Sequence, residues 1–424
     1  MARTLTLPTA VAVCGLFLVA SLQSQEPQGA RPGGPGGRGG RGQVQLPEGA
    51  GKELVTATCQ GCHQLNMITG TAGYTQAGWR DLTRTMVALP EAQGAIITDY
   101  LATNFPPKPG RAPKLMPGDV TVTFKEWIAP TLGQRSRDPI QTADGNIWWN
   151  GQFGSLIGRL DPRTGVMKEW KLDPEARPHS ITPDAQGNIW YTGNANGTIG
   201  RLNPATGEIK VFKMPDPAAR DPHTAVFHPN GMLYFTLQQS AMLGQLNPTT
   251  GEIKLVSTPT PRALPYGIKV NSQGQLWISY NGAGKLASMD PVTMAIREFA
   301  LPDAASRSRR LALTADDTVW FVNSSLGRIG RMNPRTGEVK EWPSPSGPQS
   351  HPYAIEVIDD IVWYNESNQR PDALVRFDPK TEKFQSWAIP SGVGIIRHMR
   401  KTPDGNLTIH QSSSNRIGLA IIGR

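Results

Sequence analysis

The sequence predicts a seven-bladed β-propeller preceded by a small all-α domain. Three observations support this prediction. A short motif built around a tryptophan recurs along most of the chain at intervals of 42 to 45 residues. A shorter segment ahead of the repeats has apolar residues at helical spacing instead. A stretch rich in glycine, proline and arginine separates this segment from an apolar N-terminus.

The repeat consists of short strands and turns. One copy reads Gly187-Asn188-Ile189-Trp190, followed by an Ile-Gly-Arg strand and an Asn-Pro-Ala-Thr-Gly turn. The tryptophan position recurs as Trp148, Trp190, Tyr234, Trp277, Trp320, Trp363 and Thr408, at spacings of 42, 44, 43, 43, 43 and 45 residues. The turn proline recurs as Pro162, Pro204, Pro248, Pro291, Pro334 and Pro379. A period near 43 without helical periodicity is typical of four-stranded propeller blades.

The two ends of the repeat region predict how the ring closes. The last copy stops after 417–421, which corresponds to its third strand. Its missing fourth strand should resemble Lys168-Glu169-Trp170, and such a segment occurs ahead of the first copy, at 122–127. We therefore expect the N-terminal strand to complete the final blade, giving seven blades over residues 118–424. A closed ring leaves no long sheet edge exposed.

The first 24 residues have the pattern of a signal peptide. Arg3 lies near the start, the apolar run 10–20 follows, and the segment ends in small and polar residues. The run is too short for a comfortable membrane span. Cys14 lies inside the run, which argues against a lipoprotein cysteine. We expect a periplasmic or otherwise exported protein with no stable membrane span after cleavage. An uncleaved N-terminal anchor is the alternative.

Residues 25–46 are rich in glycine, proline and arginine and predict a flexible linker. The chain has a formal net charge of +9, part of which comes from this linker. An Arg-Gly segment can bind nucleic acid, but export makes that partner unsuitable, and no nucleic-acid module is present. A basic surface favours acidic partners instead.

Residues 47–106 predict a small helical domain. A first helix is expected over 48–58, and a second opens at Thr75 with Leu82, Met86 and Leu89 at helical spacing. A third is expected over 91–104. The proline-rich residues 107–117 then form a linker to the propeller.

The helical segment contains the motif Cys59-Gln60-Gly61-Cys62-His63. Two cysteines separated by two residues can both bond a haem through thioether links, and the adjacent His63 can then ligate the iron. A redox dithiol or a zinc half-site is the alternative. Zinc would need two more ligands, and the segment contains no other cysteine or histidine. The motif therefore predicts one covalently bound haem c.

The ligand on the opposite face of the iron is expected to be a methionine. Met67 lies only four residues after His63, on the same side of the haem. Met86 lies in the next predicted helix and is the preferred ligand, with Met116 as the alternative. A methionine ligand suits electron transfer, whereas an open iron would suit small-molecule chemistry. Both methionines could instead fill space in the core.

This segment resembles bacterial class I-like cytochrome c domains through Cys59, Cys62, His63, Trp79 and Met86. The resemblance covers residues 47–106 and implies a small all-α cytochrome c domain. In many relatives a proline carbonyl soon after the haem histidine orients its imidazole. Here no proline follows until Pro90, so that contact must come from elsewhere.

The start of each inner strand should border the central mouth of the propeller. Counting eleven residues back from the tryptophan position, with one residue fewer in the sixth blade, gives one large polar or aromatic residue per blade. These seven residues are Arg137, His179, His223, Tyr266, Arg309, Tyr353 and Arg397. Three arginines and two histidines around one axis predict an electropositive site for an anionic ligand or an acidic surface. A solvated ring that merely ends the strands is the alternative.

The repeats resemble the streptogramin (virginiamycin B) lyase propellers through Gly-Asn-Ile-Trp, Ile-Gly-Arg and Pro-His at blade entry. The resemblance implies catalysis by histidines at blade entry, with glutamates and a magnesium ion. His179 and His223 match the two entry motifs, and Asp221 stands where the family has an acid. The family's further glutamate is replaced by Leu237 or Gln238, so a magnesium site is poorly supported. Only Glu366 is an acid at that blade position.

Together these features favour an exported haem c protein for single-electron transfer. Its propeller would be a platform for a redox partner protein or an anionic small molecule. One alternative is an oxidoreductase that acts on an anionic substrate at the mouth and is coupled to the haem. Another is a lyase-like enzyme with an appended cytochrome. Fold resemblance alone does not decide between them.

Overall fold

The computed structural model describes residues 44–424, except for 62–63, 72, 109, 393 and 424. The predicted signal peptide and nearly all of the predicted linker lie outside the described residues, as do Cys62 and His63. Residues from Gln45 onward form one compact unit. Within the described part of the chain, no helix has both the length and the apolar character needed to cross a membrane.

Among the described residues, four helices precede the strands: α1 (Lys52–Gln60), α2 (Asn66–Thr69), α3 (Gln76–Met86) and α4 (Glu91–Asn104). The helices expected from Thr75 and over 91–104 are confirmed. Thr75 is the N-cap of α3, and its side chain accepts a hydrogen bond from the Gly78 amide at 3.1 Å. The first helix starts four residues later than expected. Its N-cap is Gly51, whose φ of 95° lies outside the helical region.

The helices enclose one apolar cluster that contains Val55, Trp79, Leu82, Ile97 and Leu101. Trp79 is buried, and its indole N–H donates to the Phe105 carbonyl at 3.0 Å. This bond fixes the end of α4 against α3. Cys59 and Met86 are partly buried and pack against the same cluster.

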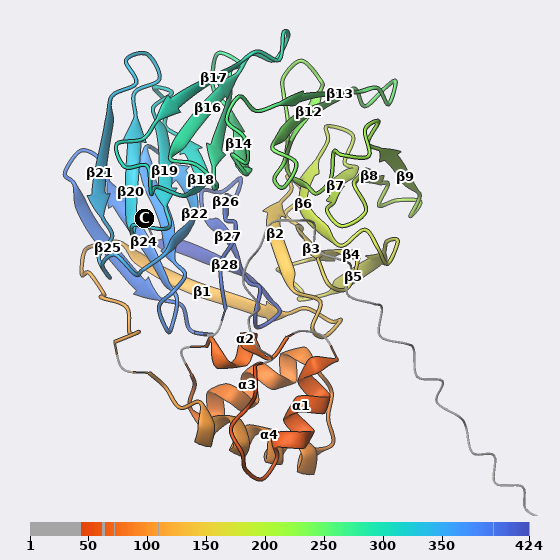
Figure 1. Ribbon diagram of the computed structural model, residues 1–424, viewed down its shortest axis with the longest axis vertical. Coiled ribbons are helices and arrows are strands. Elements are labelled where there is room, and N and C mark those ends of the chain that lie inside the picture. Colours follow the sequence, from red (N-terminus) through yellow and green to blue (C-terminus); the bar gives the residue numbers. More distant parts are fainter. Residues whose placement is uncertain (1–43, 62–63, 72, 109, 393, 424) are drawn as a thin grey trace, which may run out of the picture. The chain divides into compact units, whose positions relative to one another are not determined.

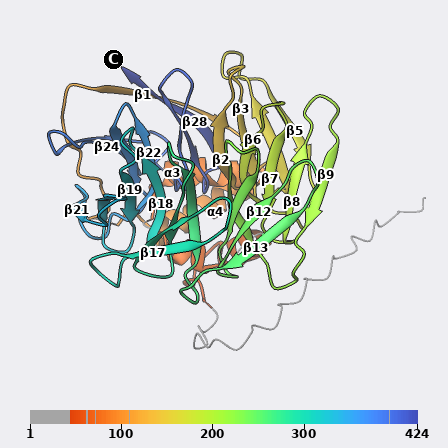
Figure 2. The same cartoon turned by 90° about the horizontal axis from the view of Figure 1, so that it is seen from above.

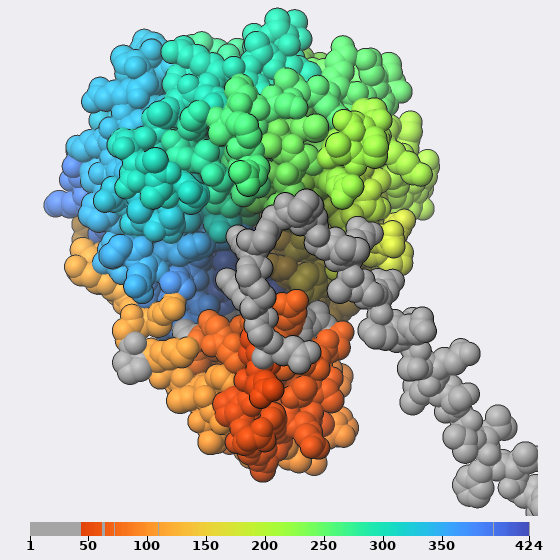
Figure 3. All heavy atoms as spheres, in the orientation of Figure 1, coloured from red at the N-terminus to blue at the C-terminus, as the bar shows by residue number. Residues whose placement is uncertain are grey.

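The strands form seven four-stranded antiparallel sheets, as predicted. In Figures 1 and 2 the sheets follow one another around a ring in sequence order. In the space-filling view of Figure 3, side chains fill the spaces that the ribbons leave between blades. Six blades are built from four consecutive strands, numbered outward from the axis.

The strands of blades 1 to 3 are β2 (Ser136–Gln141), β3 (Ile147–Gly151), β4 (Leu156–Leu160), β5 (Met167–Lys171), β6 (Pro178–Pro183), β7 (Ile189–Gly193), β8 (Thr198–Leu202), β9 (Ile209–Lys213), β10 (Pro222–Phe227), β11 (Leu233–Leu237), β12 (Met242–Leu246) and β13 (Ile253–Ser257). Those of blades 4 to 6 are β14 (Pro265–Val270), β15 (Leu276–Tyr280), β16 (Lys285–Met289), β17 (Ile296–Ala300), β18 (Ser308–Leu313), β19 (Val319–Asn323), β20 (Arg328–Met332), β21 (Val339–Pro343), β22 (Pro352–Ile358), β23 (Ile361–Glu366), β24 (Ala373–Asp378) and β25 (Lys383–Ala388).

The seventh blade joins the two ends of the propeller. It contains β26 (Arg400–Lys401), β27 (Leu407–Gln411), β28 (Arg416–Gly423) and, as its outer strand, β1 (Thr121–Ile128). β1 pairs with β28 along its whole length, from Thr121 opposite Gly423 to Ile128 opposite Arg416. Figure 1 shows the two strands side by side. The predicted closure by the N-terminal strand is therefore confirmed.

A recurring glycine allows large aromatic side chains to fill each blade. Gly200 of β8 pairs with Tyr191 of β7, and a Cβ atom at Gly200 would lie 2.0 Å from the Tyr191 ring. The same relation holds in three other blades, where the glycine and its aromatic partner are Gly158 and Trp149, Gly244 and Phe235, and Gly330 and Phe321. This explains the Ile-Gly-Arg motif of the repeat.

We predict that Gly200→Ala lowers the free energy of unfolding by about 1–3 kcal/mol, because the buried Tyr191 ring must move. Urea denaturation followed by circular dichroism measures the change. Gly94→Ala is the matched control. Its Cβ would meet no atom within 4 Å inside α4, so it should keep or slightly raise stability. Equal midpoints for wild type and Gly200→Ala would contradict this packing.

Candidate functional site at the propeller mouth

In six blades, a register shift near the start of the inner strand turns side chains toward the axis. In blade 2, Pro178 pairs with Gly193 and Ile181 pairs with Tyr191, which leaves His179 inside an irregularity. Six blades share such a shift. A β-bulge re-aims the side chains of its residues. The bulge therefore positions the side chains that form the mouth.

In blades 2, 3 and 4, a hydroxyl group of the second strand holds the bulge in place. Thr192 accepts a hydrogen bond from the Ser180 amide at 3.0 Å and donates to the carbonyl of His223 in the next blade at 3.2 Å. Thr236 makes the same two bonds in blade 3, and Ser279 makes them in blade 4. Each hydroxyl replaces a backbone hydrogen bond that the bulge breaks between the first two strands. It also fixes the backbone of the mouth residue in the next blade.

Blade 7 uses a histidine for the same purpose, because its inner strand β26 has only two residues. Nε2 of His410 accepts hydrogen bonds from the amides of Arg397 and His398, at 3.0 and 3.2 Å. Its Nδ1–H donates to the Ser136 carbonyl at 2.9 Å. Burial is the main cause that lowers the pKa of His410 to about 3, so this imidazole is neutral.

The structure brings six of the seven predicted mouth residues into contact. The rings of His179 and His223 lie 3.6 Å apart, and those of His223 and Tyr266 lie 4.0 Å apart. The Tyr266 hydroxyl bonds the Tyr353 hydroxyl. Arg309 and Arg397 complete the arc, with Nη1 atoms 3.5 and 3.2 Å from the Tyr353 oxygen.

The seventh residue, Arg137, is buried beside this arc. Its Nη1 donates to Gln152 Oε1 at 2.7 Å, and its Nε has no hydrogen-bond partner among the described residues. Burial and the nearby Arg397 lower its pKa to about 10. Arg137 therefore carries a charge that the surrounding residues do not neutralise well.

The exposed layer of the mouth is rich in guanidinium groups. Arg135, Arg309 and Arg397 are half-buried, whereas Tyr353 below them is 3% exposed. Burial and repulsion from Arg397 and Arg137 lower the pKa of Arg135 to about 9. No ion pair among the described residues includes any of these arginines. A cluster of like charges without a carboxylate is costly unless an anion binds.

The mouth histidines are neutral. Burial, followed by the charge of Arg137, holds the pKa of His179 well below its usual value. Burial and Arg310 do the same for His223. The imidazole of His179 donates through Nδ1 to the His223 carbonyl at 3.1 Å. These rings consequently act as aromatic and hydrogen-bonding surfaces, and not as cations.

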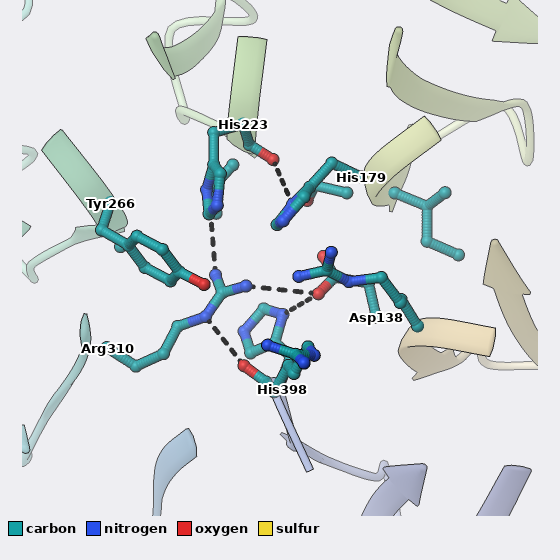
Figure 4. Close-up of polar contacts among 12 residues, drawn as sticks. Asp138, His179, His223, Tyr266, Arg310 and His398 are labelled. Carbon is teal, nitrogen blue, oxygen red and sulfur yellow. Dashed lines mark hydrogen bonds and ion pairs between the residues drawn. The ribbon is translucent and has the colours of Figure 1, made fainter. Parts of the chain in front are cut away.

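A second layer of polar contacts crosses the propeller axis beside the mouth residues, as Figure 4 shows. Arg310 reaches across the axis, donating to Thr224 Oγ1 at 3.0 Å and pairing with Asp138 at 3.4 Å. His398 Nδ1–H donates to the same carboxylate at 2.9 Å, and Arg400 lies 3.6 Å from its second oxygen. Asp138 is fully buried.

Asp138 remains ionised in this layer. Burial by itself would raise its pKa, but His398, Arg310 and Arg400 hold the pKa well below the usual value. The pKa of His398 is lowered by burial and by Arg310, so the imidazole is a neutral donor to the carboxylate. One carboxylate therefore binds two guanidinium groups in the axis.

Two predicted acids lie outside the mouth ring. Asp221 accepts hydrogen bonds from the Gln239 amide at 2.8 and 2.9 Å, so it fixes the loop after β11. Burial raises its pKa to about 7. Glu366 is fully buried and accepts bonds from the hydroxyls of Ser344 and Ser346. Both carboxylates have structural partners.

Sequence reasoning missed the second layer and part of the rim. The missed residues are Arg135, Asp138, Arg310, His351, His398, Arg400 and His410. Asp138, Arg310 and His398 each directly follow a predicted mouth residue, which is the signal that could have found them. In a regular strand these side chains would point to the opposite face. Only the bulge turns both neighbours toward the axis.

Of the motif residues 59–63, the structure describes Cys59, Gln60 and Gly61. Cys59 is in the last turn of α1 and Met86 ends α3. The alternative ligand Met116 is held on blade 6, where its backbone exchanges bonds with Ser386 at 2.8 and 3.0 Å. Met67 is 49% exposed. Among these methionines only Met86 packs against the cluster that Cys59 also borders.

Several hydrogen bonds join the helices to loops that flank the mouth. Arg416, at the start of β28, donates to Asp81 of α3 at 2.7 Å. The Gly133 amide, two residues before Arg135, donates to the Thr85 carbonyl at 3.0 Å. These bonds connect the end of α3 with blades 7 and 1.

Comparison with known proteins gives consistent results for the propeller. Residues 119–370, more than half of the chain, match the model of the virginiamycin B lyase family. A streptogramin B lyase structure shares 22% identity at a TM-score of 0.65, covering 71% of this chain and 98% of its own. A catalytically inactive virginiamycin B lyase from Staphylococcus aureus, solved with quinupristin, shares 22% identity at a TM-score of 0.64. The match covers 72% of this chain and 100% of the lyase chain.

A more distant match is hydrazine synthase from Kuenenia stuttgartiensis. It shares 12% identity at a TM-score of 0.55 and covers 69% of this chain and 96% of its own. At these identities the structural matches establish the propeller fold alone. The search of curated proteins gives no match.

The Asp138 layer predicts a large effect on stability. Asp138→Asn should lower the free energy of unfolding by about 3 kcal/mol or more, because two buried guanidinium groups lose their counter-charge. Chemical denaturation at pH 7 measures this. The control Asp359→Asn removes an exposed partner of Lys401 and should change stability by less than about 1 kcal/mol. Equal losses in both variants would contradict the assigned role.

Proposed function

The chain belongs to the virginiamycin B lyase family, and we propose that it is an exported haem c protein whose propeller binds an anion at its mouth. The observation that carries the anion site is the mouth itself. Four arginines, Arg135, Arg137, Arg309 and Arg397, surround Tyr353 without a carboxylate partner. Export is proposed from the signal-peptide pattern of residues 1–24.

The helical residues fit a covalent haem. Cys59 and Met86 come from different helices and border one apolar cluster, so both could contact one haem. Cys59 and Cys62 would hold the porphyrin, and His63 and Met86 would ligate its iron. A bound haem c supplies single-electron transfer, and a methionine ligand raises its reduction potential. Trp79 and Leu82 provide apolar surface that excludes water.

The mouth residues suit a small oxyanion or carboxylate. Arg309 and Arg397 are half-buried, so part of each side chain is open to solvent. A guanidinium binds carboxylate or phosphate oxygens in a planar, two-point geometry. The aromatic faces of Tyr266, His223 and His179 continue the arc and favour a planar ligand. An acidic side chain of a redox partner would satisfy the same arginines.

The mouth does not fit a magnesium ion. Magnesium prefers carboxylate oxygens. Asp138 is committed to Arg310 and His398, and Asp221 is committed to the Gln239 amide. No group of three or more His, Cys, Asp or Glu side chains suited to a metal occurs in the described part of the chain. These residues therefore do not support the lyase reaction implied by the family.

One observation favours a haem-coupled oxidoreductase as the second candidate. Thr85, next to Met86, accepts a hydrogen bond from Gly133, which is two residues from Arg135 of the mouth. A substrate held by the mouth arginines would thus lie on loops that contact the helix carrying the axial ligand. A plain electron carrier does not need this proximity.

We predict that Met86 is the axial ligand. Protein made in a host that attaches haem should keep haem after denaturation, and Cys59→Ala should weaken or abolish this attachment. Met86→Ala should remove the long-wavelength absorption band of methionine-ligated ferric haem and lower the reduction potential. Met116→Ala is the control and should leave both unchanged. Loss of the band in Met116→Ala alone would contradict the assignment.

We predict that the mouth binds sulfate, measured by isothermal titration calorimetry. Arg309→Ala or Arg397→Ala should weaken binding by about 10- to 100-fold, because each removes a charge-assisted hydrogen bond. Arg335→Ala removes the same charge from an exposed turn and should have little effect. Equal losses in all three variants would show that net charge, and not the mouth, binds the anion.

A further inference from the structure

Tyr353 lies at the centre of the mouth, with its oxygen surrounded by hydrogen-bond donors. Arg397 Nη1 lies 3.2 Å from this oxygen and Arg309 Nη1 lies 3.5 Å from it. The third partner is the Tyr266 hydroxyl. The guanidinium groups also lie over the Tyr353 ring, at 4.5 Å for Arg309 and 5.4 Å for Arg397.

This arrangement favours a phenolate over a phenol. A neutral phenol has one proton to donate, and the two guanidinium groups cannot accept it. The only acceptor would be Tyr266, whose own proton would then need a partner. A phenolate at Tyr353 accepts from Arg309, Arg397 and Tyr266 at once. All three donors are then satisfied in a buried site.

Four of the six ionisable groups that face Tyr353 are guanidinium groups, whose charge favours its phenolate. The groups are Tyr266 of β14, Arg309 of β18, Arg397 before β26, Arg137 of β2, Arg135 before β2 and His351 before β22. Burial by itself would raise the pKa of Tyr353, but Arg397, Arg309 and Arg137 lower it to about 6. Burial raises the pKa of Tyr266, so that residue keeps its proton.

We infer that Tyr353 is ionised in the empty mouth and that an anion binding to Arg309 and Arg397 replaces this charge, so that Tyr353 takes up one proton from solvent. The O–H bond of Tyr353 forms at the expense of a solvent proton, and no other bond changes. This inference rests on the proposed anion site. The preferred ligand is an anion whose binding is coupled to the uptake of one proton. This is thermodynamically equivalent to binding the ligand in its acid form.

The affinity of the mouth for an anion should depend on pH. Proton uptake on binding means that affinity falls as pH rises above the free pKa, by up to about tenfold per pH unit. His351 does not interfere, because burial and Arg309 lower its pKa to about 4. Asp221 titrates near pH 7, but it contacts the Gln239 amide and no mouth arginine.

Calorimetric titration of the full-length haem protein with sulfate tests the inference, because sulfate does not titrate in this range. Titrations at pH 7 in two buffers of different ionisation enthalpy give the number of protons taken up. Wild type should take up close to one proton, and affinity should fall severalfold to tenfold from pH 7 to 8. Tyr353→Phe should take up close to none. The control Asp221→Asn should retain the uptake, because Asp221 contacts the Gln239 amide.

Sulfate binding without proton uptake in wild type would overturn the inference while leaving the anion site intact. Absence of sulfate binding would overturn the proposed anion site instead. A ligand-free titration of ultraviolet tyrosinate absorbance then decides the state of Tyr353. Wild type should show one tyrosine more than Tyr353→Phe ionising near pH 6, and identical titrations would refute the phenolate.

Discussion

The pairing of β1 with β28 is the constraint on which the rest of the molecule depends. It joins the strand that follows the helices to the last strand of the chain, over eight residue pairs. Without this pairing the seventh blade would lack its outer strand and the ring would be open. Closure fixes seven inner strands around one axis, and that axis brings together residues separated by more than two hundred positions in sequence.

The closed ring alone does not make a site. Bulges at the inner strands of six blades turn side chains toward the axis. The hydroxyls of Thr192, Thr236 and Ser279 hold three of these bulges. Asp138 then fixes Arg310 and Arg400 below the mouth. The layer above has no comparable acid. The arginines of the lower layer have a carboxylate partner and those of the rim have none, which is why we assign ligand binding to the rim.

Much of this was predictable because propeller repeats have a fixed geometry. Counting back from Trp190 or Trp320 reaches the mouth regardless of the loop sequences. The first helix was misplaced because Gly51 stops it from starting at Glu48. The roles of Asp221 and Asp138 could not be read from the repeat. A bulge and contacts between distant blades decide them, and neither leaves a periodic pattern. Cys62 and His63 stay predictions from their motif.

We propose two chemical halves in one chain, a helical part that holds haem c and a propeller that binds an anion at its mouth. A crystal structure of the protein, purified from a haem-attaching host and grown in sulfate, tests this most directly. The proposed function predicts electron density for an anion that contacts Arg309 and Arg397, and for a porphyrin bonded to Cys59 and Cys62. A mouth without an anion, or cysteines without porphyrin, would contradict it.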